Sequence, residues 1–319
     1  MRENLTSIGG GKHSIWSERH IGLGIHHIAF DKFVAEVTAG PVILIMPGKM
    51  FRSPCIASPA RDDRPMPLLP FAKTPRFFIG AISLLGLTLS ALAADDAAER
   101  TRAMLAKTEA ELAKATEALA RSPDSVPLHS RRGDCQLFLG HFAEAVADFE
   151  KMIALDPTHD APHWRLGIAY YFAGDFAKAA RQFEKYHAYD GGDRENGVWK
   201  FLSQARGESL TKARTEMLVY TRFDREPFPA LYEMFAGKRT TDEVFADIKS
   251  KGLEGDERVM FFANYYAGLN EALLGHRERA IELTKKAAAS EWGQTAEGGP
   301  AYMWQVARLH ADRLKSGAE

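Results

Sequence analysis

Two histidines four residues apart, His159 and His163, are the first side chains of this sequence whose types and spacing could do chemistry. On one helix this spacing directs both imidazoles to the same side, as zinc sites require. Pro162 stands between them and favours a helix that begins after His159. No third ligand follows at a suitable spacing. We therefore expect structural or solvent-exposed histidines, no metal site and no other cofactor.

Four carboxylates between residues 194 and 255 could act as a general acid and base: Asp224, Glu226, Glu233 and Asp242. Such catalysis needs two of them in one cleft with shifted pKa values, and their spacing does not require that. The sequence contains neither His-Glu-x-x-His nor Gly-x-Ser-x-Gly. We expect Cys135 to be a buried small apolar side chain. The sequence therefore predicts no enzyme and no catalytic residue, and an envelope hydrolase using these carboxylates is the alternative.

The overall charge excludes a general binder of nucleic acid. The chain has 319 residues, with 41 Lys and Arg against 42 Asp and Glu, and a formal net charge of −1. No global basic field attracts a polyanion. The 45% hydrophobic content is that of a globular protein, and two cysteines are too few for a disulfide framework. Stability must come from packing.

Residues 66–93 have the pattern of a signal peptide. A short basic head carrying Lys73 and Arg76 is followed by an uncharged apolar stretch and by small residues at Ala91 and Ala93. We expect cleavage after Ala93 and a secreted or periplasmic protein. The alternative keeps the segment 77–94 as a membrane anchor, and only then is a membrane a partner.

The 65 residues before Met66 show isolated apolar runs but no sustained period. We expect residues 1–65 to be a mis-annotated or disordered extension that is absent from the mature protein. In that interpretation Met66 is the true initiator.

A 34-residue period begins at Ser125. Shifted by this amount, the sequence matches itself at pairs that include Gly133 with Gly167 and Phe149 with Phe183. The period and residue types resemble the tetratricopeptide repeat, a pair of antiparallel helices. Small residues let paired helices approach closely, and the aromatic residues fill the space between them. One unit alone exposes an apolar face, so stacking must supply the core.

The sequence thus predicts an all-α fold, a right-handed α-solenoid of tetratricopeptide helical hairpins. Its expected parts are an N-terminal capping helix within 94–124, two repeat units over 125–193, diverged helical hairpins over 194–255, and a further repeat-like unit with a C-terminal capping helix over 256–319. Pro227 and Pro229 interrupt the diverged part.

The order of four blocks is similar to that of the NlpI-type periplasmic tetratricopeptide proteins. The blocks are His163–Tyr171, a tryptophan helix over Val198–Ala205, Leu231–Gly237 and Tyr265–Lys286. The resemblance implies a non-catalytic envelope adaptor, often a homodimer, that binds proteases and cell-wall hydrolases. The lipid-bearing cysteine of that family is missing here, which favours a soluble periplasmic form.

The first helices of stacked hairpins line a concave surface, and repeat positions predict which side chains face it. The residues expected to bind a protein or peptide are Asp134, Leu137, Phe138, Trp164, Ile168, Tyr171, Phe172, Tyr265 and Leu269. Of these, we expect Trp164 and Tyr171 to be exposed. Packing against neighbouring helices is the competing role for the apolar ones. A self-associating scaffold, with this groove as the dimer contact, is a further alternative.

Overall fold

The computed structural model describes the backbone of residues 77–318 and the side chains of residues 99–318. All the described residues belong to one unit of the chain, Lys73–Glu319. The expected extension at 1–65 lies outside the described residues, and so do the side chains of the expected signal peptide at 66–93 and of the alternative anchor at 77–94. Among the helices with described side chains, none is both long enough and apolar enough to cross a membrane.

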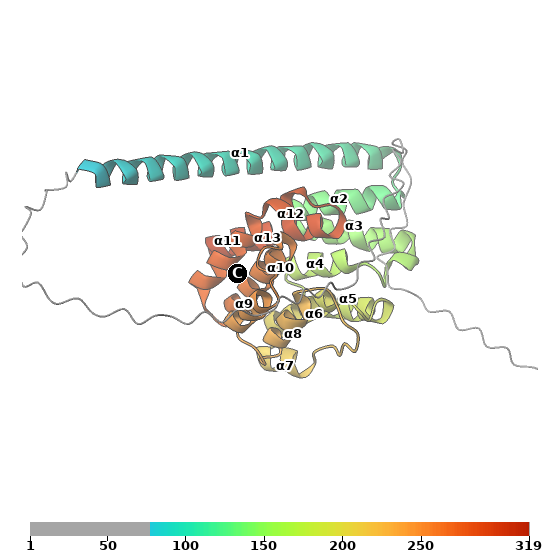
Figure 1. Ribbon diagram of the computed structural model, residues 1–319. Coiled ribbons are helices and arrows are strands. Elements are labelled where there is room, and N and C mark those ends of the chain that lie inside the picture. The colour runs from blue at the N-terminus through green and yellow to red at the C-terminus, as the bar shows by residue number, and fades with distance from the viewer. Residues whose placement is uncertain (1–76, 319) are drawn as a thin grey trace, which may run out of the picture. The chain divides into compact units, whose positions relative to one another are not determined.

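Every regular element of the described part is a helix (Figure 1). In chain order the elements are α1 (Phe77–Arg121), α2 (Val126–Phe138), α3 (Phe142–Leu155), η1 (Pro157–His159), α4 (Trp164–Phe172), α5 (Phe176–Tyr189), α6 (Arg194–Gly207), α7 (Leu210–Thr215), α8 (Phe228–Phe235), α9 (Thr241–Ser250), α10 (Glu257–Leu273), α11 (Arg277–Ala288), α12 (Glu291–Thr295) and α13 (Gly298–Ser316). The expected all-α solenoid of helical hairpins is confirmed.

Three hairpins share the same turn: α2 with α3, α4 with α5, and α10 with α11. Each turns at a glycine in the left-handed region, Gly140, Gly174 and Gly275, with φ of 85°, 82° and 81°. A side chain at these positions would strain the backbone, which is why glycine recurs there. The turn therefore repeats even in the third hairpin, whose sequence has diverged most.

The small residues of the repeat act as expected. A Cβ atom on Gly133 would lie 2.6 Å from the ring of Phe149, and one on Gly167 would lie 2.6 Å from the ring of Phe183. Each ring thus occupies the space that glycine leaves open across its hairpin. In the third hairpin a Cβ atom on Gly268 would instead lie 2.7 Å from the methyl group of Thr284, so the close helix crossing persists without the aromatic ring.

Helix α1 lies beside α2 (Figure 1). Its contact stripe contains the buried side chains of Ala115 and Leu119, which recur at helical spacing. Glu111 on the same stripe forms an ion pair with Arg131 of α2. The apolar stripe and this ion pair hold α1 on the first hairpin.

Candidate functional site

The C-terminal helix α13 lies against the inner face of the hairpins. Tyr302 of α13 packs on Phe138 of α2 and on Trp164 of α4, with both ring centroids 4.8 Å away. Further along α13, His310 lies 4.6 Å from the Phe172 ring and its Nδ1 is 2.6 Å from the hydroxyl of Tyr265. The helix expected to cap the end of the stack therefore fills the middle of its concave face.

This packing decides where the predicted binding residues lie. Leu137, Ile168, Phe172, Tyr265 and Leu269 are all buried in the core. Tyr171 is only 5% exposed, so the expectation that it is exposed is wrong. Periodicity identifies the inward face of a first helix, but it does not reveal that a helix more than 100 residues later covers that face.

Phe138 and Trp164 are half-buried at the edge of the same core. Their rings remain in contact with Tyr302 rather than standing free. The role of the nine predicted residues in binding a partner stays a prediction.

Asp134 is also engaged inside the chain. Its Oδ2 accepts a hydrogen bond of 2.5 Å from Arg165 of the next hairpin, and Arg165 also donates to the Ser130 hydroxyl at 2.9 Å. Its other oxygen is buried and has no hydrogen-bond donor among the described residues. Burial raises the pKa of Asp134 to about 6, although the guanidinium of Arg165 opposes this. Asp134 therefore links two hairpins and does not reach into an open groove.

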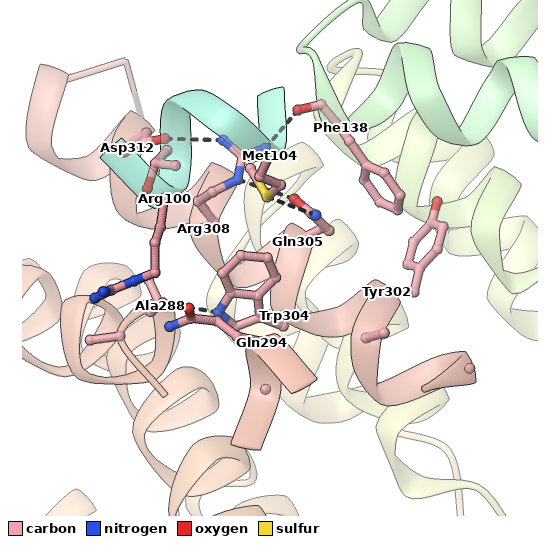
Figure 2. Close-up of a pocket in the computed structure, with 15 residues that line it drawn as sticks. Arg100, Met104, Phe138, Ala288, Gln294, Tyr302, Trp304, Gln305, Arg308 and Asp312 are labelled. Atoms are coloured by element: carbon pink, nitrogen blue, oxygen red, sulfur yellow. Dashed lines mark hydrogen bonds and ion pairs between the residues drawn. The ribbon is translucent and has the colours of Figure 1, made fainter. Parts of the chain in front are cut away.

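In the part of the chain whose side chains are described, two cavities lie beside α13. The first, which we call the α1–α13 cavity, has a volume of about 630 Å³. Figure 2 shows its walls: Met104 from α1, Phe138 from α2, and Tyr302, Trp304 and Gln305 from α13.

The polar groups of the α1–α13 cavity are largely used within the chain. The Trp304 indole donates to the carbonyl of Ala288 at 2.9 Å. Arg308 donates to the carbonyl of Phe138 at 2.6 Å and to Gln305 at 3.2 Å (Figure 2). Burial lowers the pKa of Arg308. These hydrogen bonds hold the side chains of the cavity wall in place. The surface that lines the open space is mainly apolar.

The second cavity, which we call the α10 cavity, has a volume of about 370 Å³ and meets α13 near its C-terminal end, at Leu314. Its lining residues come from five helices: Tyr171, Leu202, Arg206, Leu269, Ala272, Leu273, Gly275, Arg277 and Leu314. Two of the predicted binding residues, Tyr171 and Leu269, are therefore brought together in its wall. The two arginines are functional candidates that the repeat positions did not indicate.

The histidines and the cysteine have structural surroundings. His163 caps α4, with its Nδ1 accepting from the backbone N–H of Leu166 at 3.0 Å. Burial lowers its pKa to about 3, so the ring stays neutral and able to accept. His159 lies in η1, outside α4. Among the described residues no His, Cys, Asp and Glu side chains group as metal ligands, and Cys135 is buried as expected.

The four carboxylates of the hydrolase alternative pair with four different cations, some of which also contact other carboxylates. Glu226 pairs with Lys251 at 2.8 Å, and Asp224 with Arg225 at 3.2 Å. Glu233 pairs with Arg239, and Asp242 with Arg279. No two of the four share a partner. The arrangement resembles a set of separate ion pairs more than a pair of catalytic groups.

A largely buried charge cluster, in which the Arg225 side chain is 25% exposed, was not indicated by the sequence. Arg225 lies against Asp193, Glu195 and Asp224, and its guanidinium stacks 4.3 Å above the ring of Phe228. Burial raises the pKa of Glu195, although Arg225 opposes this. The cluster fastens the long loop before α8 to the start of α6. The sequence does contain two stretches made up of charged residues, at 193–195 and 224–226. Only the fold shows that these two stretches lie against each other.

Comparison with known proteins agrees with this architecture. A family model described as tetratricopeptide repeat matches residues 139–196, which run from the end of α2 into α6. The chain is also 39% identical over 49 residues to "Protein SGT1 homolog" of Bos taurus, a stretch of 15% of this chain and 14% of that protein. The chain thus matches only about 14% of the length of that relative.

These matches support a tetratricopeptide repeat protein. Repeats of this kind indicate a scaffold for protein–protein interaction, because stacked hairpins present extended concave surfaces. The matched family is defined by its helical hairpins and not by a catalytic activity. The resemblance to the NlpI-type proteins stays a prediction.

Proposed function

We propose that this chain is an exported, non-catalytic adaptor that holds a segment of another envelope protein on the concave side of its solenoid. One observation carries the proposal. Helix α13 fills the middle of the concave side, yet one cavity runs along it from Gly298 to Asp312 and another touches its C-terminal end at Leu314. Predicted binding residues line both, with Phe138 in the α1–α13 cavity and Tyr171 and Leu269 in the α10 cavity. Partner contacts then concentrate at these two openings.

The export and the kind of partner are supported by sequence alone. The signal-peptide pattern at 66–93 supports transfer to the periplasm. The resemblance to NlpI-type proteins supports a protease or a cell-wall hydrolase as the partner. N-terminal sequencing of the protein from a periplasmic fraction tests the export. Ala94 as the first residue is expected, whereas a peptide from residues 1–65 in the exported protein contradicts the processing.

Affinity capture from an envelope extract tests the binding. Replacing Tyr171 would damage the core, so the sharper variants fill the cavities: Ala301→Trp in the α1–α13 cavity and Ala272→Trp in the α10 cavity. Ala147→Trp, on the exposed side of α3, is the matched control. We expect quantitative mass spectrometry to show that a cavity variant loses partners that the control retains.

One outcome of that capture and one outcome of a second measurement would contradict the proposal. Equal recovery of every partner by all the folded variants would exclude both cavities as binding sites. Light scattering on the purified full chain addresses the remaining alternative. If a second copy of the chain is the only species bound, the protein is a self-associating scaffold and not an adaptor.

A further inference from the structure

The α10 cavity combines an apolar floor with a basic rim. Leu202, Leu269, Leu273 and Leu314 supply aliphatic surface from α6, α10 and α13. Arg206 at the end of α6 and Arg277 at the start of α11 supply two guanidinium groups. The described residues that line the cavity include no carboxylate. The wall is therefore complementary to a ligand that carries an apolar group beside negative charge.

Arg277 in particular is placed to meet a ligand. Its hydrogen bond within the described part of the chain is to the carbonyl of Lys315, at the long distance of 3.5 Å. The next arginine along α11, Arg279, is instead held by Asp242 and Glu271. Two arginines on the same helix turn thus differ, because one is neutralised by carboxylates of the chain and the other faces the cavity.

The surface continues outward from this cavity. A shallow depression lined by His276, Glu278, Arg279 and Glu282 meets it at Gly275 and Arg277, which belong to both. Leu274, next to the cavity wall, is 42% exposed. No atom lies within 4 Å of where a Cβ on Gly275 would be. A ligand seated in the cavity can therefore leave it along the surface, which favours an extended chain over a compact molecule.

We propose that the α10 cavity binds an extended peptide segment of a partner in which acidic side chains flank a leucine, with the leucine against the aliphatic floor and a carboxylate on Arg277. This inference rests on the proposed adaptor function and adds the chemistry of the segment that is held. The volume of about 370 Å³ lies at the small end of ligand sites, roughly 300–1,000 Å³, and suits one or two side chains. A bidentate guanidinium–carboxylate contact supplies the orientation.

Fluorescence anisotropy with a defined probe tests the proposal. The probe is a fluorescein-labelled peptide, Gly-Ser-Glu-Leu-Leu-Glu-Ser-Gly amide, titrated with the full chain. We expect Arg277→Glu to weaken binding about tenfold or more. Lys286→Glu is the matched control, because Lys286 is an exposed cation on the same helix; it should change binding by less than about twofold. Peptides with Gln for Glu, or Ser for Leu, should bind more weakly than the probe.

Ala272→Trp distinguishes binding inside the cavity from attraction by the general charge of the surface. The tryptophan fills the floor of the cavity, and both arginines are kept. We expect it to abolish probe binding, while circular dichroism and the melting temperature show that the variant is folded. The proposal is overturned if the probe does not bind the wild type. It is also overturned if Arg277→Glu and Lys286→Glu act alike, if only a peptide with a free C-terminal carboxylate binds, or if dodecanoate binds in place of the peptide.

Affinity capture distinguishes this inference from the adaptor function on which it rests. If Arg277→Glu recovers the same envelope partners as the wild type, the adaptor stands and the acidic segment is wrong. If the wild type captures no partner at all, both fail. If Arg277→Glu loses partners that Lys286→Glu retains, both are supported.

Discussion

The ring of Tyr302 stands edge-on to the ring of Trp164, with centroids 4.8 Å apart and planes at 79°. These residues belong to α13 and α4, and their contact shows that the last helix is built into the concave face. Edge-to-face aromatic pairs are worth about 0.5–1.5 kcal/mol beyond the area they bury. The contact therefore helps to keep α13 in place.

A double-mutant cycle measures this contact. Tyr302→Ala and Trp164→Ala should each lower the free energy of unfolding, and their coupling should be about 0.5–1.5 kcal/mol. Urea unfolding of the two single variants and the double variant gives the coupling. Purely additive effects would mean that α13 does not rest on α4 in solution.

The helix crossing inside the second hairpin gives a further prediction. A Cβ on Gly167 would lie 2.6 Å from the Phe183 ring, so Gly167→Leu should overpack the crossing and lower the free energy of unfolding by about 1–3 kcal/mol. Gly255→Ala is the control, because no atom lies within 4 Å of its Cβ position. A melting temperature for Gly167→Leu equal to that of the wild type would refute the assigned contact.

The buried charge cluster should depend on its arginine. Arg225→Ala leaves Asp193, Glu195 and Asp224 together without their shared cation, and we expect a loss of about 3–5 kcal/mol in the free energy of unfolding. Arg258→Ala, which breaks an ion pair in which the Arg258 side chain is 46% exposed, should cost about 1 kcal/mol or less. Chemical denaturation compares the two. Equal, small losses would show that the cluster is not buried.

The pH dependence of stability tests the surroundings of Asp134. Its pKa in the folded protein is raised to about 6 from 3.8, chiefly by burial. The folded state therefore holds the proton more tightly than the unfolded chain, and this group lowers the free energy of unfolding as the pH rises through that interval. Below 3.8 both states are protonated, so the loss is absent there.

The measurement is the difference in unfolding free energy between Asp134→Asn and the wild type as a function of pH. The free energy of unfolding of the variant, relative to that of the wild type, should rise between pH 3.8 and about 6. Above that pH the difference should stay constant. Asp124→Asn, at a side chain that is 74% exposed, is the matched control. A difference for Asp134→Asn that is independent of pH would contradict the burial of this carboxyl group.

The hairpins could be predicted because their determinants are local. Gly133 and Phe149 meet across a single hairpin, and the same pair recurs one repeat later as Gly167 and Phe183. The turn at Gly140 needs a backbone conformation that favours glycine. Periodicity therefore carries enough information to place the helices of one unit and to stack the next unit on it.

The site was harder to predict because its determinants are distant in sequence. Tyr171 occupies an inward position, but its exposure depends on His310, whose ring centroid is 5.6 Å away. The charges of Arg225 and Glu195 likewise meet only through the path of the loop before α8. Repeat positions contain no information on where a diverged last helix will pack, and that helix decides which inward residues stay open.

Hydrogen exchange of the full chain with and without a captured envelope partner tests the central claim most directly. If the partner uses the openings beside α13, the amides of residues 298–316 stay protected in both samples. New protection then appears at the cavity walls, foremost around residues 269–277. Faster exchange in 298–316 when the partner is bound, with no protection gained at either cavity, would show that the partner displaces the helix and would contradict the account.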